Sequence, residues 1–262
     1  MDEPLLTERR GSVLWLTLNR PAAHNALNSV LCAGLLSAFQ SASADETARA
    51  IVLTGAGERT FCSGADLKEN NGGMFASPTG TNPIADVLRA MTACSKLVIG
   101  RLNGSALAGG LGLVSACDLV YAADHAKFAL PEVKAGLFPM MVTTHLIRQL
   151  PRRRFYEMAY LGEALNAAEA ERYDLINRAV PAAELDAVLD AVLAKLLTNS
   201  PMSLSSGKKA VQQMQDMAAP EMLAFAELMI GKLGASADAI EGRAAFAEKR
   251  KPKWAEEPES KS

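Results

Sequence analysis

The first 140 residues alternate between short runs of β-forming residues and runs with helical spacing, joined by glycine-rich loops. Residues 12–19 and 50–54 have the composition of strands, and the apolar spacing after Asn28 indicates a helix with an asparagine cap. This alternation predicts an α/β fold, because strands and helices in this order pack as layers around one core.

The rest of the chain is nearly all helical in pattern. From Val142 onward, most segments carry apolar residues at helical spacing, and a short apolar stretch before Pro181 interrupts them. The last of these segments have apolar stripes that must be buried against another surface. We therefore predict a core at 1–200 and a helical region at 201–262.

Composition and charge exclude several classes of protein. The formal net charge of -2 argues against nucleic-acid binding through overall charge. No apolar run reaches the roughly 18 residues needed to span a bilayer, and the start, MDEPLLTERR, does not resemble a secretory signal. The four cysteines and three histidines are dispersed without a CxxC pair, so we expect no metal site and reduced thiols in a cytoplasmic protein.

The stretch NGSALAGGLGLVSACD, residues 103–118, places four glycines within nine residues. Gly104 and Gly109 have the spacing of a P-loop, but the Lys and Ser/Thr of that motif are absent. The run 110–115 ends in Ser115 where a dinucleotide fingerprint has its last glycine. Both nucleotide motifs fail, so the stretch is better explained as a site of exposed backbone N–H donors at the start of a helix.

Two further segments have the residue types of a reaction centre. FCSGAD, residues 61–66, ends a strand in a turn whose N–H groups can face an anion. Glu132 follows Pro131 directly after an apolar strand, between Leu130 and Val133. Apolar surroundings disfavour the ionised carboxylate, which raises its pKa toward the range useful for proton transfer. A plain helix start with a dipole-compensating glutamate would show the same residues.

In combination, four segments resemble the crotonase superfamily, also called the enoyl-CoA hydratase/isomerase family. They are LNRPAAHNALN (18–28), FCSGADLKE (61–69), the run from NGSALAGG to KAGLFP (103–139) and AFAEKRKPKW (245–254). The resemblance covers nearly the whole chain. It implies a crotonase-like spiral of ββα repeats at 1–200, and a C-terminal helical region at 201–262 that serves as a lid or in trimerisation.

The resemblance also implies an acyl-CoA thioester substrate and a homotrimer or a dimer of trimers. Coenzyme A then enters as part of the substrate, and no separate cofactor, nucleic acid or membrane is expected. By motif position, the backbone N–H groups of Ala65 and Gly109 form an oxyanion hole for the thioester oxygen, and Glu132 is the acid/base. The residues expected to contact the substrate are His24, Ala26, Leu27, Ser63, Gly64, Asp66, Leu67, Gly110, Gly112, Pro131, Pro139, Met140 and Lys249.

One position departs from the family's hydratase pattern. Hydratases usually carry a second glutamate after the glycine run, and Gly112 stands there instead. A single carboxylate can still move a proton between two carbons on one face, so the pattern favours double-bond isomerisation. A hydratase, dehydratase or decarboxylase with a different second group, and a silent acyl-CoA-binding subunit, remain alternatives. His145 is a candidate for that second group, whereas we expect Asp118 to be a structural anchor.

Overall fold

The computed structural model describes residues 3–69 and 81–255. By its internal contacts the chain divides into two compact units. The first comprises Met1–Cys94 and Val98–Leu189, and the second comprises Ser95–Leu97 and Asp190–Ser262. The boundary expected at residue 200 stays a prediction about domains.

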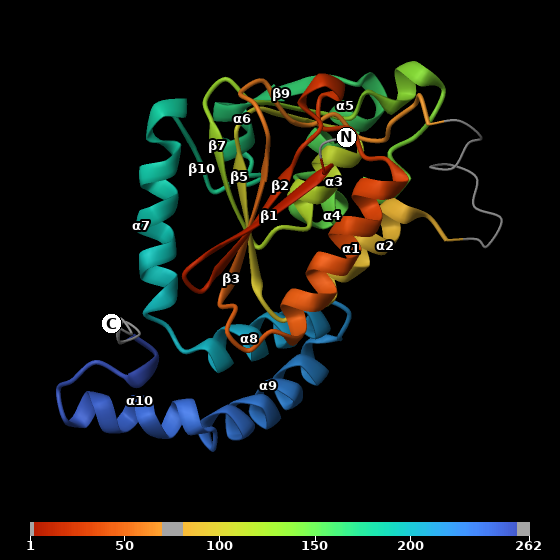
Figure 1. Ribbon diagram of the computed structural model, residues 1–262. Helices are drawn as coiled ribbons and strands as arrows, with labels where there is room; N and C mark the ends of the chain where they lie inside the picture. The colour runs from red at the N-terminus through yellow and green to blue at the C-terminus, as the bar shows by residue number, and fades with distance from the viewer. Residues whose placement is uncertain (1–2, 70–80, 256–262) are drawn as a thin grey trace, which may run out of the picture. The chain divides into compact units, whose positions relative to one another are not determined.

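A six-stranded sheet forms the centre of the first unit (Figure 1). Its strands, in spatial order, are β1 (Leu5–Arg10), β2 (Val13–Leu18), β3 (Ala50–Gly55), β5 (Leu97–Leu102), β7 (Leu119–Ala123) and β10 (Arg178–Val180). β1 and β2 form an antiparallel hairpin, whereas β2 with β3, β5 with β7, and β7 with β10 are parallel. β3 is buried along its whole length, as expected of a strand covered on both faces.

A second, four-stranded sheet contains β4 (Thr60–Cys62), β6 (Ser105–Leu107), β8 (Lys127–Ala129) and β9 (Ala164–Asn166) in that order. Three successive strand pairs, β3–β4, β5–β6 and β7–β8, each place their first strand in the six-stranded sheet and their second in the four-stranded sheet. The chain therefore advances as a spiral of repeating turns. The α/β fold with a crotonase-like spiral is confirmed.

Helices and short 3₁₀ turns fill the connections of the first unit. The helices are α1 (Ser29–Ala44), α2 (Pro83–Ala93), α3 (Gly109–Ser115), α4 (Met140–Gln149), α5 (Arg152–Leu161), α6 (Ala167–Arg172) and α7 (Leu185–Leu197), the last of which runs on into the second unit. The 3₁₀ turns are Pro21–Ala23, Pro131–Ala135 and Ala182–Glu184. Asn28 caps α1 as predicted, because its side-chain oxygen accepts a hydrogen bond from Leu31 N at 2.9 Å.

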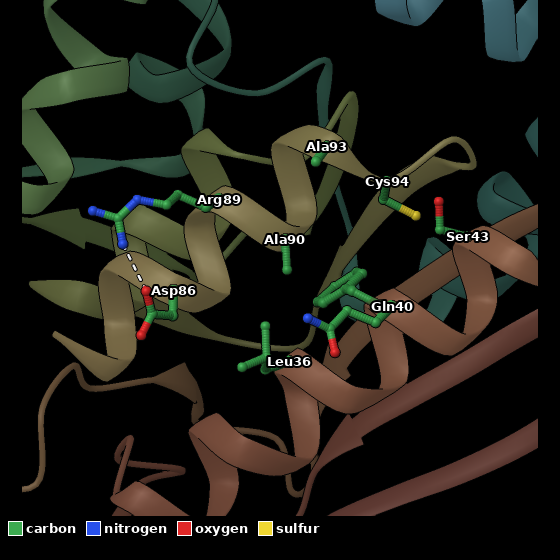
Figure 2. A pocket seen from close by; sticks show the side chains of 9 residues that line it. Leu36, Gln40, Ser43, Asp86, Arg89, Ala90, Ala93 and Cys94 are labelled. Atoms are coloured by element: carbon green, nitrogen blue, oxygen red, sulfur yellow. Dashed lines mark hydrogen bonds and ion pairs between the residues drawn. The ribbon is translucent and has the colours of Figure 1, made fainter. Parts of the chain in front are cut away.

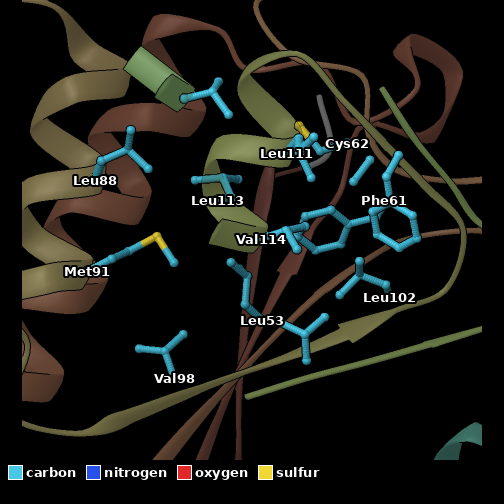
Figure 3. Close-up of a cluster of buried hydrophobic side chains, with 14 of the residues drawn as sticks. Leu53, Phe61, Cys62, Leu88, Met91, Val98, Leu102, Leu111, Leu113 and Val114 are labelled. Carbon is cyan, nitrogen blue, oxygen red and sulfur yellow. The ribbon is translucent and has the colours of Figure 1, made fainter. Parts of the chain in front are cut away.

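The core of the first unit lies around α3, between the strands and α2. Figure 3 shows part of it, with Leu111, Leu113 and Val114 of α3 pointing into the same cluster as Leu88 and Met91 of α2. Every residue of α3 is buried. A glycine-rich helix is therefore held at the centre of the unit by packing on all sides, which fixes the position of its first turn.

The second unit is helical, as the sequence indicates. It contains α8 (Pro201–Met214), α9 (Ala219–Gly234), α10 (Ala237–Ala247) and a 3₁₀ turn at Lys253–Ala255. Ser200 caps α8 through Ser203 N at 3.0 Å and also donates to Asp238 of α10. Among the described residues, no helix combines the length and the apolar character needed to cross a bilayer.

Candidate active site

One side of the predicted site is a short parallel bridge between Leu27 and Ala65. Leu27 N donates to Gly64 O at 2.7 Å, and Asp66 N donates to Leu27 O at 2.8 Å. Successive N–H groups of an extended chain point to opposite sides, so the N–H of Ala65 points away from residue 27. The bridge thus holds the Ala65 peptide without using its donor.

The other side is the start of α3. Ala108 precedes the helix with φ +50°, an uncommon value for a residue with a Cβ, and its N–H donates to Ala129 O at 2.9 Å. Gly109 is the first helical residue, and the first N–H groups of a helix have no partner within it. The turn at Ala108 therefore leaves the N–H of Gly109 as a donor for a partner outside the helix.

The two sides meet at Gly64. A Cβ at this position would lie 2.7 Å from the Cβ of Ala108 and 3.0 Å from Gly109 N. Gly64 also has φ +94°, which side chains rarely tolerate. Only glycine allows the 63–66 turn to approach the start of α3 this closely, and the structure thereby places Gly64, the residue before Ala65, against Gly109. The joint role of Ala65 and Gly109 stays a prediction.

Gly110 and Gly112 have different surroundings. A Cβ at Gly110 would overlap the carbonyl of Cys62, lying 2.8 Å from its carbon, so this glycine lets α3 pack directly on β4. A Cβ at Gly112 would make ordinary contacts, 3.4 Å from Val142 Cγ2 and 3.8 Å from Leu88 Cδ1. Position 112 therefore has room for a methyl group, and the nearest atoms around it are apolar.

Glu132 lies in the first turn of the 3₁₀ helix Pro131–Ala135 and is half-buried. Within the described residues, its Oε2 atom is buried and has no hydrogen-bond partner. Burial raises the pKa of this carboxyl, and a hydrogen bond from its own backbone opposes the rise more weakly. A buried carboxylate oxygen without a partner is available to a proton on a bound molecule.

The two other candidate groups have structural contacts. The Oδ2 atom of Asp118 accepts from Val98 N at 2.7 Å, and Asp118 N donates to Val98 O at 2.8 Å. Asp118 is thus the anchor that the sequence predicts. The ring nitrogens of His145 face the hydroxyls of Thr92 at 3.4 Å and Thr144 at 3.0 Å, and burial lowers the pKa of this imidazole.

The remaining predicted contact residues lie in several elements. Ala26 is buried, Ser63 N donates to His24 O at 3.1 Å, and Pro139 directly precedes α4. Leu67 and Met140 are exposed, at 69% and 63%, although they are large and apolar. Met140 therefore does not pack in the core. Lys249 follows α10 in the second unit with φ +54°. Contact of these residues with substrate stays a prediction.

Sequence reasoning missed two polar residues that hold the site segments. Arg20 pairs with Asp66 across 2.8 Å, and Asn25 is fully buried. The Asn25 side chain donates to Ala56 O at 3.0 Å and to Thr60 O at 2.9 Å. Both lie inside the segment LNRPAAHN, residues 18–25. An arginine and an asparagine beside a turn were the signal in the sequence that could have identified them.

A groove of about 530 Å³ lies apart from these residues, between α1 and α2. Figure 2 shows Leu36 and Gln40 of α1 facing Ala90 of α2, with Asp86 and Arg89 paired at one end. None of the predicted site residues lines it. Among the described residues, no three or more His, Cys, Asp or Glu side chains group in a way that could hold a metal ion.

Comparisons with known proteins agree on one family. A family model described as enoyl-CoA hydratase/isomerase matches residues 8–257. The chain is 35% identical to 2,3-dehydroadipyl-CoA hydratase of Escherichia coli K12, over 95% of this chain and 97% of that protein. It is 34% identical to (E)-benzylidenesuccinyl-CoA hydratase of Thauera aromatica, over 95% and 98%.

Solved structures are also similar. An enoyl-CoA hydratase of Mycobacterium smegmatis superposes with a TM-score of 0.90 at 33% identity, over 97% of this chain and 100% of that one. An enoyl-CoA hydratase/isomerase of Marinobacter aquaeolei gives a TM-score of 0.89 at 27% identity, over 97% and 100%. The chain therefore belongs to the enoyl-CoA hydratase/isomerase family, the crotonase superfamily, and is an acyl-CoA-processing enzyme of that family.

Proposed function

We propose that this enzyme shifts the double bond of an enoyl-CoA thioester, with Glu132 as its single acid/base. One observation carries the proposal. Glu132 keeps a buried carboxylate oxygen without a partner, whereas position 112, where hydratases carry their second glutamate, has no side chain and apolar neighbours. One carboxylate suffices for moving a proton, and two divide the work of adding water.

The proposed step balances without a co-reactant. The Glu132 carboxylate takes a proton from C2 of a 3-enoyl thioester, and the C–H electron pair moves toward the thioester oxygen to form a dienolate. The same carboxyl returns the proton to C4. The double bond then lies between C2 and C3, and the carboxylate is restored.

The dienolate needs donors at the thioester oxygen, and the N–H groups of Ala65 and Gly109 are proposed for this role. Two observations support this role. The Ala65 N–H takes no part in the bridge to Leu27, and Gly109, the first residue of α3, lies directly against Gly64. Each fixed donor in such a hole contributes about 10²–10³ in rate. Gly109 is buried and Ala65 is partly buried, and hydrogen bonds to a developing charge are stronger away from water.

A second candidate is hydration, and the names of the relatives favour it. The relatives from Escherichia coli K12 and Thauera aromatica are both named as hydratases. Such a reaction here requires a second proton carrier other than a side chain at position 112. His145 is the candidate by residue type, and its ring nitrogens face threonine hydroxyls.

Two substrates separate the candidates. The enzyme is offered 3-hexenoyl-CoA and 2-hexenoyl-CoA separately, and the products are assigned by chromatography and mass. Isomerisation without a water adduct supports the proposal, and a product heavier by one water supports hydration. If Glu132→Gln converts 3-hexenoyl-CoA as fast as the parent, Glu132 does not carry the proton. Binding of both thioesters without turnover indicates a silent binding subunit.

Assembly, location and cofactor use are also proposals. Large apolar side chains are exposed on α9 and α10, among them Leu223, Ile230 and Phe246, the last at 87%. Exposed apolar side chains in this number favour association, and we propose a homotrimer or a dimer of trimers. We further propose a cytoplasmic enzyme that needs no group beyond the coenzyme A of its substrate.

A further inference from the structure

We propose that Arg20 is a positioning residue that fixes the Ala65 donor by clamping the two chain segments on either side of it. This inference rests on the proposed oxyanion hole. It assigns a role to a side chain that lies outside the reaction centre, and it gives Asp66 a bracing role in place of direct substrate contact.

The clamp is formed by the two ends of one guanidinium. Nη1 of Arg20 donates to Ala26 O at 2.5 Å, and Nη2 donates to Asp66 Oδ2 at 2.8 Å. Both side chains of the ion pair are largely buried, at 21% exposed for Arg20 and 14% for Asp66. A planar guanidinium can hold a carbonyl and a carboxylate in fixed relative positions, which the single ammonium of a lysine cannot.

The clamped atoms are next to the donor. Ala26 and Asp66 are the neighbours of the bridged residues Leu27 and Ala65. Asp66 N donates to Leu27 O, and the Asp66 side chain is linked to Ala26 O through Arg20, so the backbone and the side chain of Asp66 are both connected to the 26–27 segment. The Ala65 N–H belongs to the 64–65 peptide, whose carbonyl accepts from Leu27 N at 2.7 Å. Arg20 ties Asp66, the residue after Ala65, to Ala26, the residue before Leu27, and so holds this peptide in register with Leu27.

Arg20 is itself held in place. Its backbone N–H donates to Asn25 Oδ1 at 2.9 Å, and Asn25 is fully buried with its amide bound to the carbonyls of Ala56 and Thr60. A residue can hold another group in position only if its own backbone is held in place. The hydrogen bonds of Asn25 to Thr60 O in β4 and to the backbone N–H of Arg20 meet this condition.

The far end of the turn is closed as well. Asp66 Oδ1 accepts from Lys68 N at 3.0 Å, and the Glu69 carboxylate accepts from Ser29 N at 3.2 and 3.1 Å. Both oxygens of Asp66 are therefore engaged within the protein. The negative charge of Asp66 lies one residue along the chain from Ala65, the proposed donor to the oxyanion, and the positive charge of Arg20 offsets this negative charge.

The test compares variants of this pair with a matched pair in the same unit. Arg20→Gln and Arg20→Lys remove the guanidinium that contacts both segments. Asp66→Asn keeps the size and shape of the aspartate side chain, and it tests the same pair if the arginine variants fail to fold. Arg101→Gln is the control, because Arg101 is 18% exposed and pairs with Asp186 at 2.5 Å. We expect kcat to fall about 10–10²-fold in the Arg20 variants with KM changed less than about threefold, since small misplacements of a reacting group have effects of this size.

A probe of the hole separates positioning from stability. Acetoacetyl-CoA forms an enolate that absorbs in the near ultraviolet, and an oxyanion hole raises the bound enolate fraction at a given pH. We expect that fraction to fall in the Arg20 variants and in Asp66→Asn but not in Arg101→Gln, with butyryl-CoA binding unchanged in all of them. Melting temperatures are measured alongside.

The outcomes are distinct. If the parent does not stabilise the enolate, the proposed oxyanion hole is wrong and this inference falls with it. If the parent stabilises the enolate and the folded Arg20 and Asp66 variants do so equally well, Arg20 has only a structural role. A lower melting temperature with unchanged kcat and enolate fraction has the same meaning.

Discussion

At the scale of single residues, the most informative atom is Oε2 of Glu132, buried without a partner among the described residues. Burying an ionised carboxylate in this way costs free energy unless a ligand compensates. Structural carboxylates of the same unit are instead paired, as Asp66 is with Arg20 and Asp186 with Arg101. The pKa of Asp66 is held low chiefly by its hydrogen bond from Arg20, whereas burial raises the pKa of Glu132.

The raised pKa gives Glu132 a signature in both activity and stability. In the proposed reaction the carboxylate accepts the proton, so kcat/KM should rise with pH through a pKa above the usual glutamate value of 4.5. The folded state holds this proton more tightly than the unfolded chain, so stability should fall as pH rises from 4.5 through the folded pKa. Glu132→Gln should therefore unfold at a higher temperature than the parent at pH 7 and at the same temperature near pH 3, while activity falls by about 10²–10⁴.

Denaturation curves at both pH values check this prediction. Glu157→Gln is the control, because that glutamate is exposed and bound to Arg154. A Glu132→Gln variant that is less stable than the parent at pH 7 would mean that the carboxylate has a stabilising partner.

At the scale of elements, the site depends on how closely α3 approaches β4. Backbone rather than side chains makes this contact, because Gly110 lies directly against the carbonyl of Cys62. Buried asparagines hold the loops nearby. Asn103 accepts from Gly55 N at 3.1 Å and donates to Gly57 O at 2.7 Å. These contacts connect the end of β3 to the start of the glycine stretch.

Two alanine substitutions in α3 should have very different effects on stability. Gly110→Ala places a methyl group into the Cys62 carbonyl and should lower the unfolding free energy by several kcal/mol or prevent folding, since overpacking typically costs about 1–3 kcal/mol and here the obstacle is backbone. Gly112→Ala meets only ordinary contacts and should change the unfolding free energy by less than about 1 kcal/mol, which is the size of the helix preference for alanine over glycine. Thermal denaturation of both variants, with circular dichroism as the measure of folding, checks the pair. Equal destabilisation of both would contradict the packing described for α3.

The elements also show where sequence patterns were sufficient. The runs at 12–19 and 50–54 form β2 and β3, and the helix after Asn28 begins where its cap indicates. β1 and β9 were not anticipated. β1 is nearly all exposed at an edge, so it lacks the apolar alternation of a half-buried strand, and β9 has three residues. Pairing with β2 and β8, which only the folded chain provides, makes them strands.

At the scale of the whole molecule, the second unit is much the smaller of the two and carries half of the large exposed apolar side chains of the described residues. Its helices place Val211, Leu223, Ile230, Ile240 and Phe246 at exposures between 56% and 87%. Burying one such side chain contributes roughly 1.5–3 kcal/mol. This surface supports the proposed association with further copies.

Removing the most exposed of these side chains should weaken assembly. Phe246→Ser should shift the enzyme toward smaller species at micromolar concentration, with Gln213→Ser, a change at an exposed polar position of α8, as the control. Sedimentation velocity over a range of concentrations measures both. If Phe246→Ser sediments as the parent does at every concentration, the α10 face does not contribute to assembly.

The sequence by itself determined the fold class, the glycine turns and the identity of the candidate acid/base, because these follow from local periodicity and from motifs within a few residues. Only the tertiary structure decided what surrounds them. It placed Gly64 against Gly109, left Oε2 of Glu132 buried without a partner, and joined Arg20 to Asp66 across 46 positions of sequence. Such contacts arise from the packing of distant segments, and no local pattern encodes them.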